Sequence, residues 1–386
     1  MLTKNIKFKN FLFKSKKFKI EKIFKDLLKN EPNILETLKP TYKYSYSKKL
    51  ISKYKKFLNI RIIGMGGSIL GTQAIYDFIK NKIKKNVIFV NNLNSNATYF
   101  KDKKKKINLN LIISKSGNTL ETILNANTLV SNKDKNIIIT ENHDSYLTNL
   151  AKEIKCEVVN HKNFIGGRYS VLSEVGMLPA ELMNLNENKF KQFNQLIKNK
   201  KFISSLISNV SKTLNLLKSG KYASVILNYD EQSESLFKWY QQLIAESLGK
   251  KSRGFLPVIS SMPKDNHSLM QLYLDGPKKS FYTFFDVLDN NVIKIKNNKI
   301  LNSHKYLKNQ SIEDIKQFQM LATEKVFTSK KIPFRSFVIY KRNEQALGEL
   351  FCFFILETIL LGRALNVNPF DQPSVELIKK ETKLFF

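Results

Sequence analysis

Cysteine is nearly absent from this chain of 386 residues, and long apolar runs are missing. The two cysteines, Cys156 and Cys352, stand far apart and not at metal-ligand spacing, which argues against the common zinc motifs and fits a reducing compartment. No apolar stretch approaches the length of a membrane span, and the first residues lack the apolar region of a signal peptide. We therefore expect a cytoplasmic protein.

Arginine is scarce, although the net charge is +33. Only six of the 65 basic residues are arginine, and lysine is spread along the whole chain among many Asn and Ile residues. Proteins that bind nucleic acid usually cluster their charge on one face and use arginine for bidentate contacts. The pattern is more typical of a compositional drift, so we expect no specific nucleic-acid partner, although a positive field attracts anionic substrates.

The stretch 59–71 predicts an anion site. An apolar run at 60–63 ends in Gly-Met-Gly-Gly-Ser at 64–68, and a helix-compatible segment follows. A strand that ends in a glycine turn and opens a helix presents free backbone N–H groups and the positive end of the helix dipole. Ser68 adds a hydroxyl, which suits a phosphate monoester. The simpler alternative is a tight turn without a ligand.

Two nucleotide motifs are missing at this turn. A dinucleotide fold requires G-x-G-x-x-G, but Ile69 stands where the third glycine belongs. Asn91 and Asn92 follow the next strand, where such a fold carries an acidic residue. The P-loop sequence G-x-x-x-x-G-K-[ST] is absent as well. A phosphate ester therefore fits the turn better than a nucleotide does.

Short apolar strands alternate with helices between residues 58 and 160. We expect strands at 60–63, 87–90, 109–113, 137–140 and 157–159, and helices at 70–79, 120–130 and 145–154. Continuous apolar strands separated by helices indicate a parallel sheet that is covered on both faces. Ligands of such sheets lie beyond the carboxyl ends of the strands.

A polar loop, S-K-S-G-N-T-L-E-T at 114–122, follows the third of these strands. Capping the next helix needs one hydroxyl, whereas this loop offers several beside Ser68 on a neighbouring strand end. The two loops together predict a phosphate cradle.

A second alternation begins near residue 186. We expect strands at 223–227, 255–259, 281–287 and 336–340, and helices at 233–248, 312–327 and 345–365. The chain then divides into a helical arm over 1–50, a first α/β domain over 51–185, and a second over 186–386 with C-terminal helices. No clear sequence repeat relates the two domains.

Six motifs follow one another along the chain: G-M-G-G-S at 64–68, S-K-S-G-N-T-L-E-T at 114–122, G-G-R-Y-S at 166–170, Q-Q-L-I-A-E-S-L-G-K at 241–250, D-N-H-S at 265–268 and F-D-Q-P-S-V-E-L-I-K at 370–379. In this order they resemble the glucose-6-phosphate isomerase (phosphoglucose isomerase) family. The resemblance implies two doubly wound α/β sugar-isomerase (SIS) domains with parallel central sheets. It also implies the interconversion of glucose 6-phosphate and fructose 6-phosphate through a cis-enediol, in glycolysis and gluconeogenesis.

The resemblance assigns catalytic roles to residues of suitable chemistry. Glu246 would move the proton between C2 and C1, since a carboxylate can act first as base and then as acid. Arg168 would stabilise the enediolate with a permanent charge, and His267 with Lys379 would open the sugar ring. In this family the histidine comes from the neighbouring subunit, so the resemblance implies a homodimer with active sites at the interface.

The resemblance also names the residues that bind the substrate. The phosphate contacts carry over to Ser68, Ser114, Ser116 and Thr119 and to the backbone near Gly67 and Lys115, and Gln372 would contact the sugar. No metal or organic cofactor is implied. One departure is that Ser116-Gly117-Asn118 replaces the Thr-Phe-Thr of many members, which we expect to make the phosphate loop more flexible.

Three alternatives stay open. The chain could isomerise mannose 6-phosphate or an amino-sugar phosphate, because all these enzymes would share the phosphate cradle. It could be a non-catalytic sensor that binds a sugar phosphate and regulates transcription. The sequence has no helix-turn-helix segment for that role, and a sensor would have no use for Glu246, Arg168 and His267 together. Nucleic-acid binding driven by charge is the third, and it would depend strongly on salt.

Overall fold

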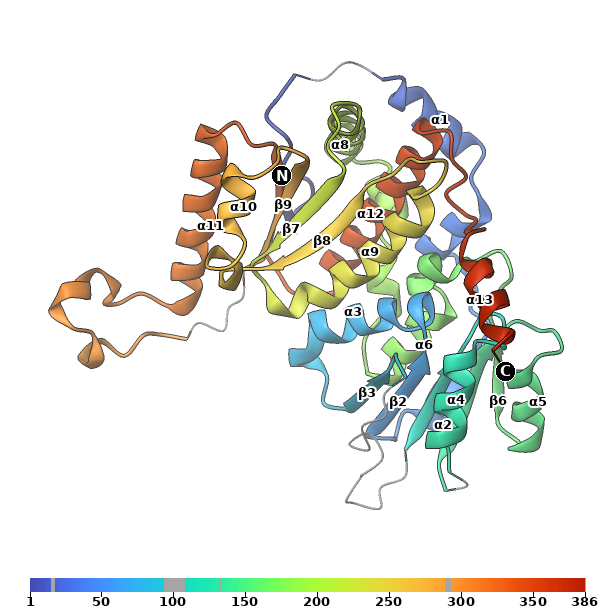
Figure 1. Ribbon diagram of the computed structural model, residues 1–386. Coiled ribbons are helices and arrows are strands. Elements are labelled where there is room, and N and C mark those ends of the chain that lie inside the picture. The colour runs from blue at the N-terminus through green and yellow to red at the C-terminus, as the bar shows by residue number, and fades with distance from the viewer. Residues whose placement is uncertain (15–17, 94–107, 132, 289–292, 386) are drawn as a thin grey trace.

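The computed structural model describes residues 1–14, 18–93, 108–131, 133–288 and 293–385, and within them it has two α/β domains, each built on a five-stranded sheet (Figure 1). The first sheet has the order β3-β2-β4-β5-β6 and is parallel throughout. Its strands are β2 (Asn59–Gly64), β3 (Asn86–Val90), β4 (Leu109–Ile113), β5 (Lys135–Thr140) and β6 (Glu157–Asn160). The parallel sheet predicted from the apolar runs is confirmed.

Helices α3 (Leu70–Ile79), α4 (Leu120–Leu129), α5 (Tyr146–Glu153) and α6 (Glu174–Leu182) belong to the first domain. Side chains on both faces of the sheet are fully buried, for example those of Ile62 and Ile63 on β2. This burial on two faces explains why the strands read as continuous apolar runs rather than as alternating ones.

The second sheet has the order β1-β10-β9-β7-β8. Strands β7 (Ala223–Asn228), β8 (Leu256–Ser261), β9 (Ser280–Val287) and β10 (Phe334–Ile339) run parallel, and β1 (Ile6–Lys9) adds an antiparallel edge. The arm expected over 1–50 is therefore not purely helical. It contains helices α1 (Ile20–Lys29) and α2 (Lys48–Tyr54), but its I-K-F-K segment alternates with the period of a strand and pairs with β10.

The helices of the second domain are α7 (Phe193–Leu196), α8 (Lys200–Lys218), α9 (Glu234–Leu248), α10 (Met270–Asp275), α11 (Ile312–Ser329), α12 (Glu344–Ala364) and α13 (Val375–Lys383). The expectation that no apolar stretch approaches the length of a membrane span was wrong for α12, which in the described part of the chain is the one helix long and apolar enough to cross a membrane by length and composition. Since 94% of its apolar window is buried inside the protein, α12 is the core helix of this domain.

The two domains meet beside the carboxyl end of β2. Helix α3 of the first domain packs against α9 of the second, and both contribute to one hydrophobic cluster that spans the domains. The indole of Trp239 on α9 is buried, donates a hydrogen bond of 3.1 Å to the carbonyl oxygen of Arg168 and packs edge-on against Phe351 of α12. A segment of the first domain that carries Arg168 is thereby fixed to the core of the second.

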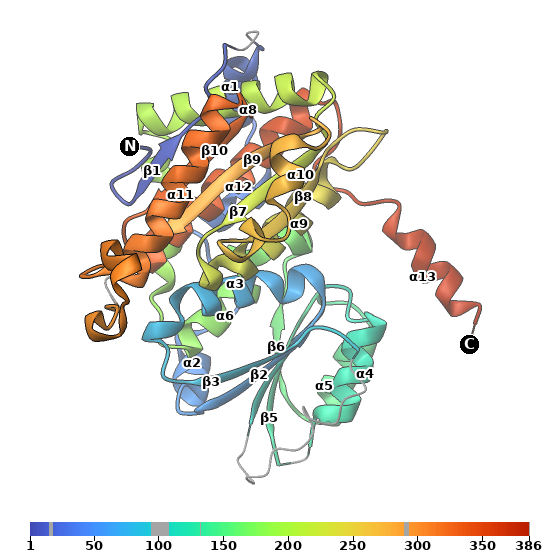
Figure 2. The same ribbon diagram turned by 60° about the vertical axis from the view of Figure 1, so that its left-hand side comes forward.

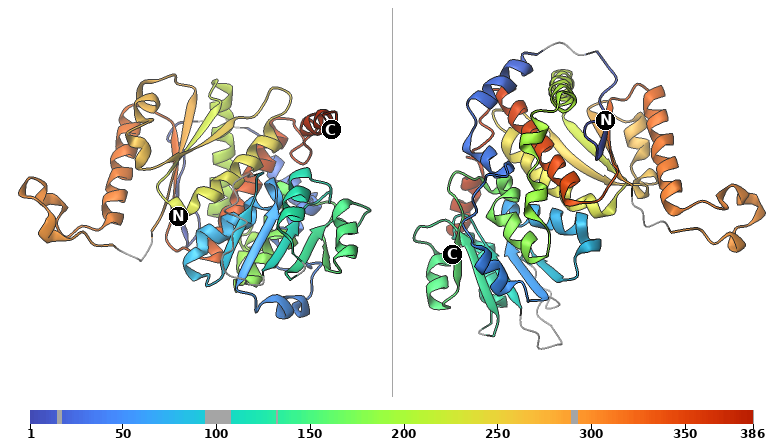
Figure 3. Two further views of the ribbon diagram at one scale, coloured as in Figure 1. Left: turned by 60° about the horizontal axis from the view of Figure 1, so that its bottom comes forward. Right: turned by 180° about the vertical axis from the view of Figure 1, so that it is seen from behind.

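Two segments project from the body on opposite sides. The segment 293–311 extends from one side, and α13 with the C-terminus lies on the other (Figure 1; both views of Figure 3). Figure 2 shows α13 standing clear of the two domains. Both segments carry exposed apolar side chains, among them those of Leu301, Tyr306 and Ile378.

Candidate active site

The glycine turn at 64–68 lies at the carboxyl end of β2, as its sequence predicts. A short 3-10 helix covers Gly66–Ser68 and leads into α3, and Gly66 has a positive φ of 52°. Gly67 packs directly on another backbone, because a Cβ atom there would lie 2.1 Å from the carbonyl carbon of Gly167. Only glycine fits at this close approach, which joins the turn to the segment that carries Arg168.

The loop at 114–119 lies beside this turn. Gly64 pairs with Ile113 across β2 and β4, so Ser114 begins at the same edge of the sheet. The hydroxyl groups of Ser114 and Thr119 lie 2.8 Å apart. Ser68 Cβ and Ile113 O both lie within 3.2 Å of the point that a Cβ of Gly64 would occupy. The predicted convergence of the two loops is therefore present.

The 114–119 loop, which we expect to be more flexible than in many family members, packs closely on its neighbours. Gly117 adopts a φ of +65°, and a Cβ atom there would lie 2.2 Å from Ser145 Oγ. The loop is tied to its neighbours by hydrogen bonds from Leu147 N to Gly117 O at 3.1 Å and from Tyr146 N to Asn118 Oδ1 at 2.9 Å. Glycine at 117 thus lets the loop pack closely on the start of α5.

Lys115 and Ser116 have their own local contacts in this loop. The Lys115 ammonium donates to the carbonyl of Asn163 at 2.8 Å and lies 3.5 Å from the Glu141 carboxylate. The hydroxyl of Ser116 accepts a hydrogen bond from the backbone N–H of Asn118 at 3.3 Å. The side chain of Lys115 therefore points toward the residues that follow β6. Its backbone is part of the 114–119 loop.

Arg168 is the centre of the site. Its side chain is 1% exposed, and its Nη1 lies 3.1 Å from Glu246 Oε2 and 2.6 Å from Gln372 Oε1. Its other nitrogens are fixed by protein oxygens, Nε by Ser247 Oγ at 2.8 Å and Nη2 by the carbonyls of Pro369 and Asp371 at 2.7 and 3.0 Å. Three residues predicted for the site therefore meet, although 204 positions separate Arg168 from Gln372.

Glu246 lies near the end of α9 with a side chain that is 28% exposed. One helical turn earlier, Gln242 Nε2 donates a hydrogen bond of 2.7 Å to Glu246 Oε1. The same amide nitrogen lies 2.9 Å from the point that a Cβ of Gly66 would occupy. The carboxylate is accordingly held beside the phosphate turn and remains reachable from solvent.

Three supporting residues were not identified from the sequence, although all lie within the motifs. Gln242 is one of them. Ser247 and Tyr169 are the others: the Tyr169 hydroxyl lies 2.9 Å from Ser247 Oγ and donates to the Pro369 carbonyl at 3.0 Å. Burial raises the pKa of Tyr169, so its hydroxyl stays protonated. The sequence offered one signal for Gln242: it stands four positions before Glu246, and residues with this spacing lie on the same face of a helix.

The loop that carries Gln372 is fixed by an ion pair. The ammonium of Lys250 lies 2.6 Å from Asp371 Oδ1, and this hydrogen bond lowers the pKa of the Asp371 carboxyl. Lys250 follows α9, so the helix that positions Glu246 also anchors the loop of Gln372.

His267 and Lys379 lie away from this group. His267 is exposed in the turn after β8, at the edge of the sheet where α9 begins, whereas Glu246 lies near the opposite end of this 15-residue helix. A helix of that length spans about 22 Å. Lys379 is exposed on α13, which projects from the body (Figure 2). A single chain thus brings together the residues expected for proton transfer and for phosphate binding. The roles of His267 and Lys379 in ring opening stay predictions.

Among the described residues, no group of three or more His, Cys, Asp or Glu side chains could hold a metal ion.

Comparison with known proteins agrees with this geometry. The family model described as phosphoglucose isomerase matches residues 41–263. A glucose-6-phosphate isomerase of Methanocaldococcus jannaschii is 33% identical over 348 residues, which cover 86% of this chain and 85% of that protein. A glucose-6-phosphate isomerase of Mycoplasmopsis pulmonis is 32% identical over 346 residues, 82% of this chain and 80% of the relative.

Two solved structures share the fold. A hypothetical protein of Thermus thermophilus has a TM-score of 0.81 and 22% identity, with 94% of each chain covered. A glucose-6-phosphate isomerase of Chlamydia trachomatis has a TM-score of 0.70 and 18% identity, covering 97% of this chain and 76% of that one. At these identities the likeness concerns the fold alone. Taken together with the sequence relatives and the matching family model, the findings place this chain in the phosphoglucose isomerase family.

Proposed function

We propose that Glu246 carries the proton between C2 and C1 while Arg168 stabilises the negative charge that develops on oxygen. The chain interconverts glucose 6-phosphate and fructose 6-phosphate, as its family and its relatives named glucose-6-phosphate isomerase indicate. The observation that carries the mechanism is the 3.1 Å contact between Arg168 Nη1 and Glu246 Oε2 beside the glycine turn. A base and a fixed cation are the two groups that an enediol intermediate requires.

The phosphate group of the substrate binds at the two converging loops. Ser68, Ser114, Ser116 and Thr119 supply hydroxyls, and the backbone at Gly67 and Lys115 supplies N–H groups. Support comes from the position of both loops at the carboxyl edge of the sheet and from the start of α3 directly after Ser68. A phosphate held there leaves the sugar carbons free to reach toward Glu246.

Arg168 suits the enediolate because its charge is permanent and already oriented. Five protein oxygens, one of them Glu246 Oε2, accept hydrogen bonds from the guanidinium and occupy its five N–H donors, so Arg168 acts on the enediolate through a charge that is fixed in advance. Arg168 Nη1 donates hydrogen bonds to both Gln372 and Glu246. In this proposal Gln372 also contacts the sugar. Gln242 holds the carboxylate in the orientation for proton transfer.

Ring opening is assigned to His267 and Lys379, with His267 supplied by a second copy of the chain. His267 lies at the far edge of the second sheet from Glu246, which supports a contribution across an interface. Large exposed apolar side chains on the two projecting segments support a homodimer as well, since such surfaces usually mark protein contacts. They include Leu301, Tyr306, Leu377, Ile378 and Phe385, all more than 60% exposed.

The proposed cellular site is the cytoplasm. Both cysteines are free in the structure, as is usual in a reducing compartment. There the reaction serves glycolysis and gluconeogenesis.

A coupled assay tests the activity. In the presence of a chelator, purified protein should form glucose 6-phosphate from fructose 6-phosphate with a kcat of about 1 to 10³ per second, the usual range for enzymes. It should convert mannose 6-phosphate far more slowly. Faster turnover of mannose 6-phosphate would favour the alternative isomerase. Tight binding of sugar phosphate without turnover would favour the sensor.

A further inference from the structure

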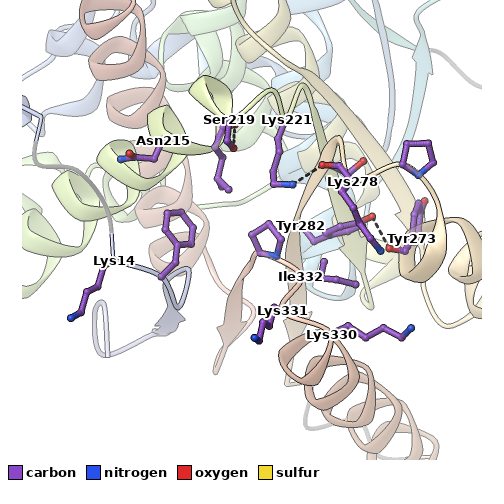
Figure 4. Close-up of a pocket in the computed structure, with 15 residues that line it drawn as sticks. Lys14, Asn215, Ser219, Lys221, Tyr273, Lys278, Tyr282, Lys330, Lys331 and Ile332 are labelled. Atoms are coloured by element: carbon purple, nitrogen blue, oxygen red, sulfur yellow. Dashed lines mark hydrogen bonds between the residues drawn. The ribbon is translucent and has the colours of Figure 1, made fainter.

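Five lysines are among the residues that line a cavity of about 540 Å³, which lies apart from the candidate active site (Figure 4). The cavity opens at the amino ends of β7, β9 and β10. The lysines come from the N-terminal segment, from the residues before β7 and β9, and from the turn between α11 and β10; they are Lys14, Lys221, Lys278, Lys330 and Lys331. Segments distant in sequence thus bring positive charge to one hollow.

Little of this charge is compensated. The lining contains no Asp or Glu among the described residues. Lys330 pairs with Asp275 at 2.9 Å, but both side chains are about half exposed, where such pairs are weak. Within the described ranges, the side chains of Lys14 and Lys331 have neither a hydrogen bond nor an ion pair. Two cations at the cavity are therefore available to a ligand.

Lys221 and Lys278 each keep unused donors. Lys221 Nζ donates to the carbonyl of Lys278 at 2.6 Å, and Lys278 Nζ donates to the carbonyl of Leu274 at 2.7 Å. An ammonium has three donors, so two remain on each in this arrangement. Burial, together with the charges of Lys278 and Lys279, lowers the pKa of Lys221. An anion in the cavity would relieve this repulsion.

Abundant lysine alone does not explain the cavity. A second cavity, at the carboxyl edge of the same sheet, is lined by Lys316 and Arg342 but also by Asp230, Glu231 and Glu313. A third, beside β5 and β6, includes Glu141 as well as Lys162. Carboxylates accompany the cations in both. The five-lysine cavity is therefore the exception among these three.

Two packed aromatic rings form one wall of the cavity. Tyr273 and Tyr282 line it, are less than 10% exposed and pack edge-on with ring centres 5.4 Å apart. These rings exclude water from one side of the cavity, which strengthens the attraction between an anion and the partly buried Lys221.

We propose that this cavity is a second anion site that binds a chain of phosphate groups, such as that of a nucleoside triphosphate or of inorganic polyphosphate. A single phosphate carries a charge of about −2 and offers oxygens on one centre only. Five cations from four segments match a ligand with three or four negative charges spread over several ångströms. Sugar phosphates with one phosphate group match this distribution less well.

Calorimetry on the full chain tests the proposal. The protein is first saturated with the equilibrium mixture of fructose and glucose 6-phosphate, so that the phosphate cradle is occupied, and is then titrated with ATP, tripolyphosphate, inorganic phosphate or adenosine. One ATP or one tripolyphosphate should bind per chain, inorganic phosphate should bind much more weakly, and adenosine should not bind. Equal affinities for ATP and tripolyphosphate would assign binding to the phosphate chain, and tighter binding of ATP would add a contribution from the nucleoside.

Matched double variants separate the site from the general positive field. Lys221→Ala with Lys331→Ala should weaken ATP binding at least about tenfold, because two charge-assisted hydrogen bonds are lost. Lys22→Ala with Lys49→Ala removes the same charge at exposed positions elsewhere and should change the affinity less than about twofold. Both variants should keep normal isomerase activity, which shows that they fold. Absence of ATP binding, or equal loss in the two variants, would overturn the proposal.

Discussion

Arg168 and Glu246 stand 78 positions apart and in different domains, yet Arg168 Nη1 lies 3.1 Å from Glu246 Oε2. The arginine is almost completely buried, whereas the carboxylate is 28% exposed. The cation is thus held by the protein while the base faces the space where a substrate can enter. This asymmetry fits their assigned roles, because the charge must be fixed in advance and the base must exchange a proton with the substrate.

Replacing the arginine by lysine should impair catalysis. Arg168→Lys keeps the positive charge but cannot reach Ser247, Pro369 and Gln372 at the same time, because lysine lacks the planar fork of donors. We expect kcat to fall by about 10²-fold or more, a loss typical of removing a preorganised group that stabilises an oxyanion. Arg363→Lys, at the end of α12, is the matched control and should leave kcat unchanged. Near-normal turnover of Arg168→Lys would contradict the role of the guanidinium.

The close approach of Gly67 and Gly167 should be intolerant of a side chain. Gly67→Ala would place Cβ 2.1 Å from the carbonyl carbon of Gly167, so the two loops would have to separate. We expect a loss of about 3 kcal/mol or more in the free energy of unfolding, measured with urea. Gly166→Ala is the control, since its Cβ would meet only Tyr169 at 3.6 Å. It should be neutral or stabilising by up to about 1 kcal/mol. Similar stabilities for the two variants would show that the loops do not pack this closely.

A buried lysine should make stability depend on pH. Burial lowers the pKa of Lys191 to about 7, far below its ordinary value of 10.5, and its ammonium donates to the carbonyls of Thr37 and Leu172. Between these two values the unfolded chain binds more protons than the folded one, so stability rises with pH. Relative to Lys191→Met, the free energy of unfolding of the wild type should rise by about 2 kcal/mol from pH 7 to pH 9. Parallel curves for both proteins would mean that Lys191 stays charged in the folded state.

Mixing two inactive variants tests whether the site spans two subunits. His267→Gln and Glu246→Gln should each have little activity alone. After subunit exchange, a heterodimer would pair the intact Glu246 of one chain with the intact His267 of the other. We expect recovery approaching a quarter of the wild-type activity, because half of the dimers would be mixed and each would have one complete site. Failure to recover any activity in dimers shown to have exchanged would place both residues in one chain.

Much of the fold follows from local patterns in the sequence. Buried parallel strands such as β4 appear as apolar runs, and the ends of the expected strands and helices agree with the structure to within two residues. Strand β1 was missed because four residues among many lysines give little periodic signal, and its pairing with β10 depends on a contact across more than 300 positions. The contacts of the loop at Gly117 could not be predicted from its own residues, because they are made with the start of α5, which lies farther along the chain.

The site was predictable only in part. The glycine turn could be read from its own residues, since a strand, a turn and a helix follow in succession. The meeting of Arg168, Glu246 and Gln372 depended on the resemblance of whole motifs, because no spacing rule connects residues so far apart. The support that Gln242 and Ser247 give requires the packed structure, in which one glutamine amide reaches both a carboxylate and a glycine turn.

Hydrogen exchange at the reacting carbon tests the central role of Glu246 most directly. Wild-type protein in deuterium oxide should introduce deuterium at C1 of fructose 6-phosphate, detected by proton NMR. Glu246→Gln should reduce this exchange by about 10³-fold or more while binding sugar phosphate with nearly unchanged affinity. Glu234→Gln on the same helix, where the carboxylate pairs with Lys238 at the surface, should exchange at the wild-type rate. Deuterium incorporation by Glu246→Gln at a rate near that of the wild type would contradict the assignment of the base.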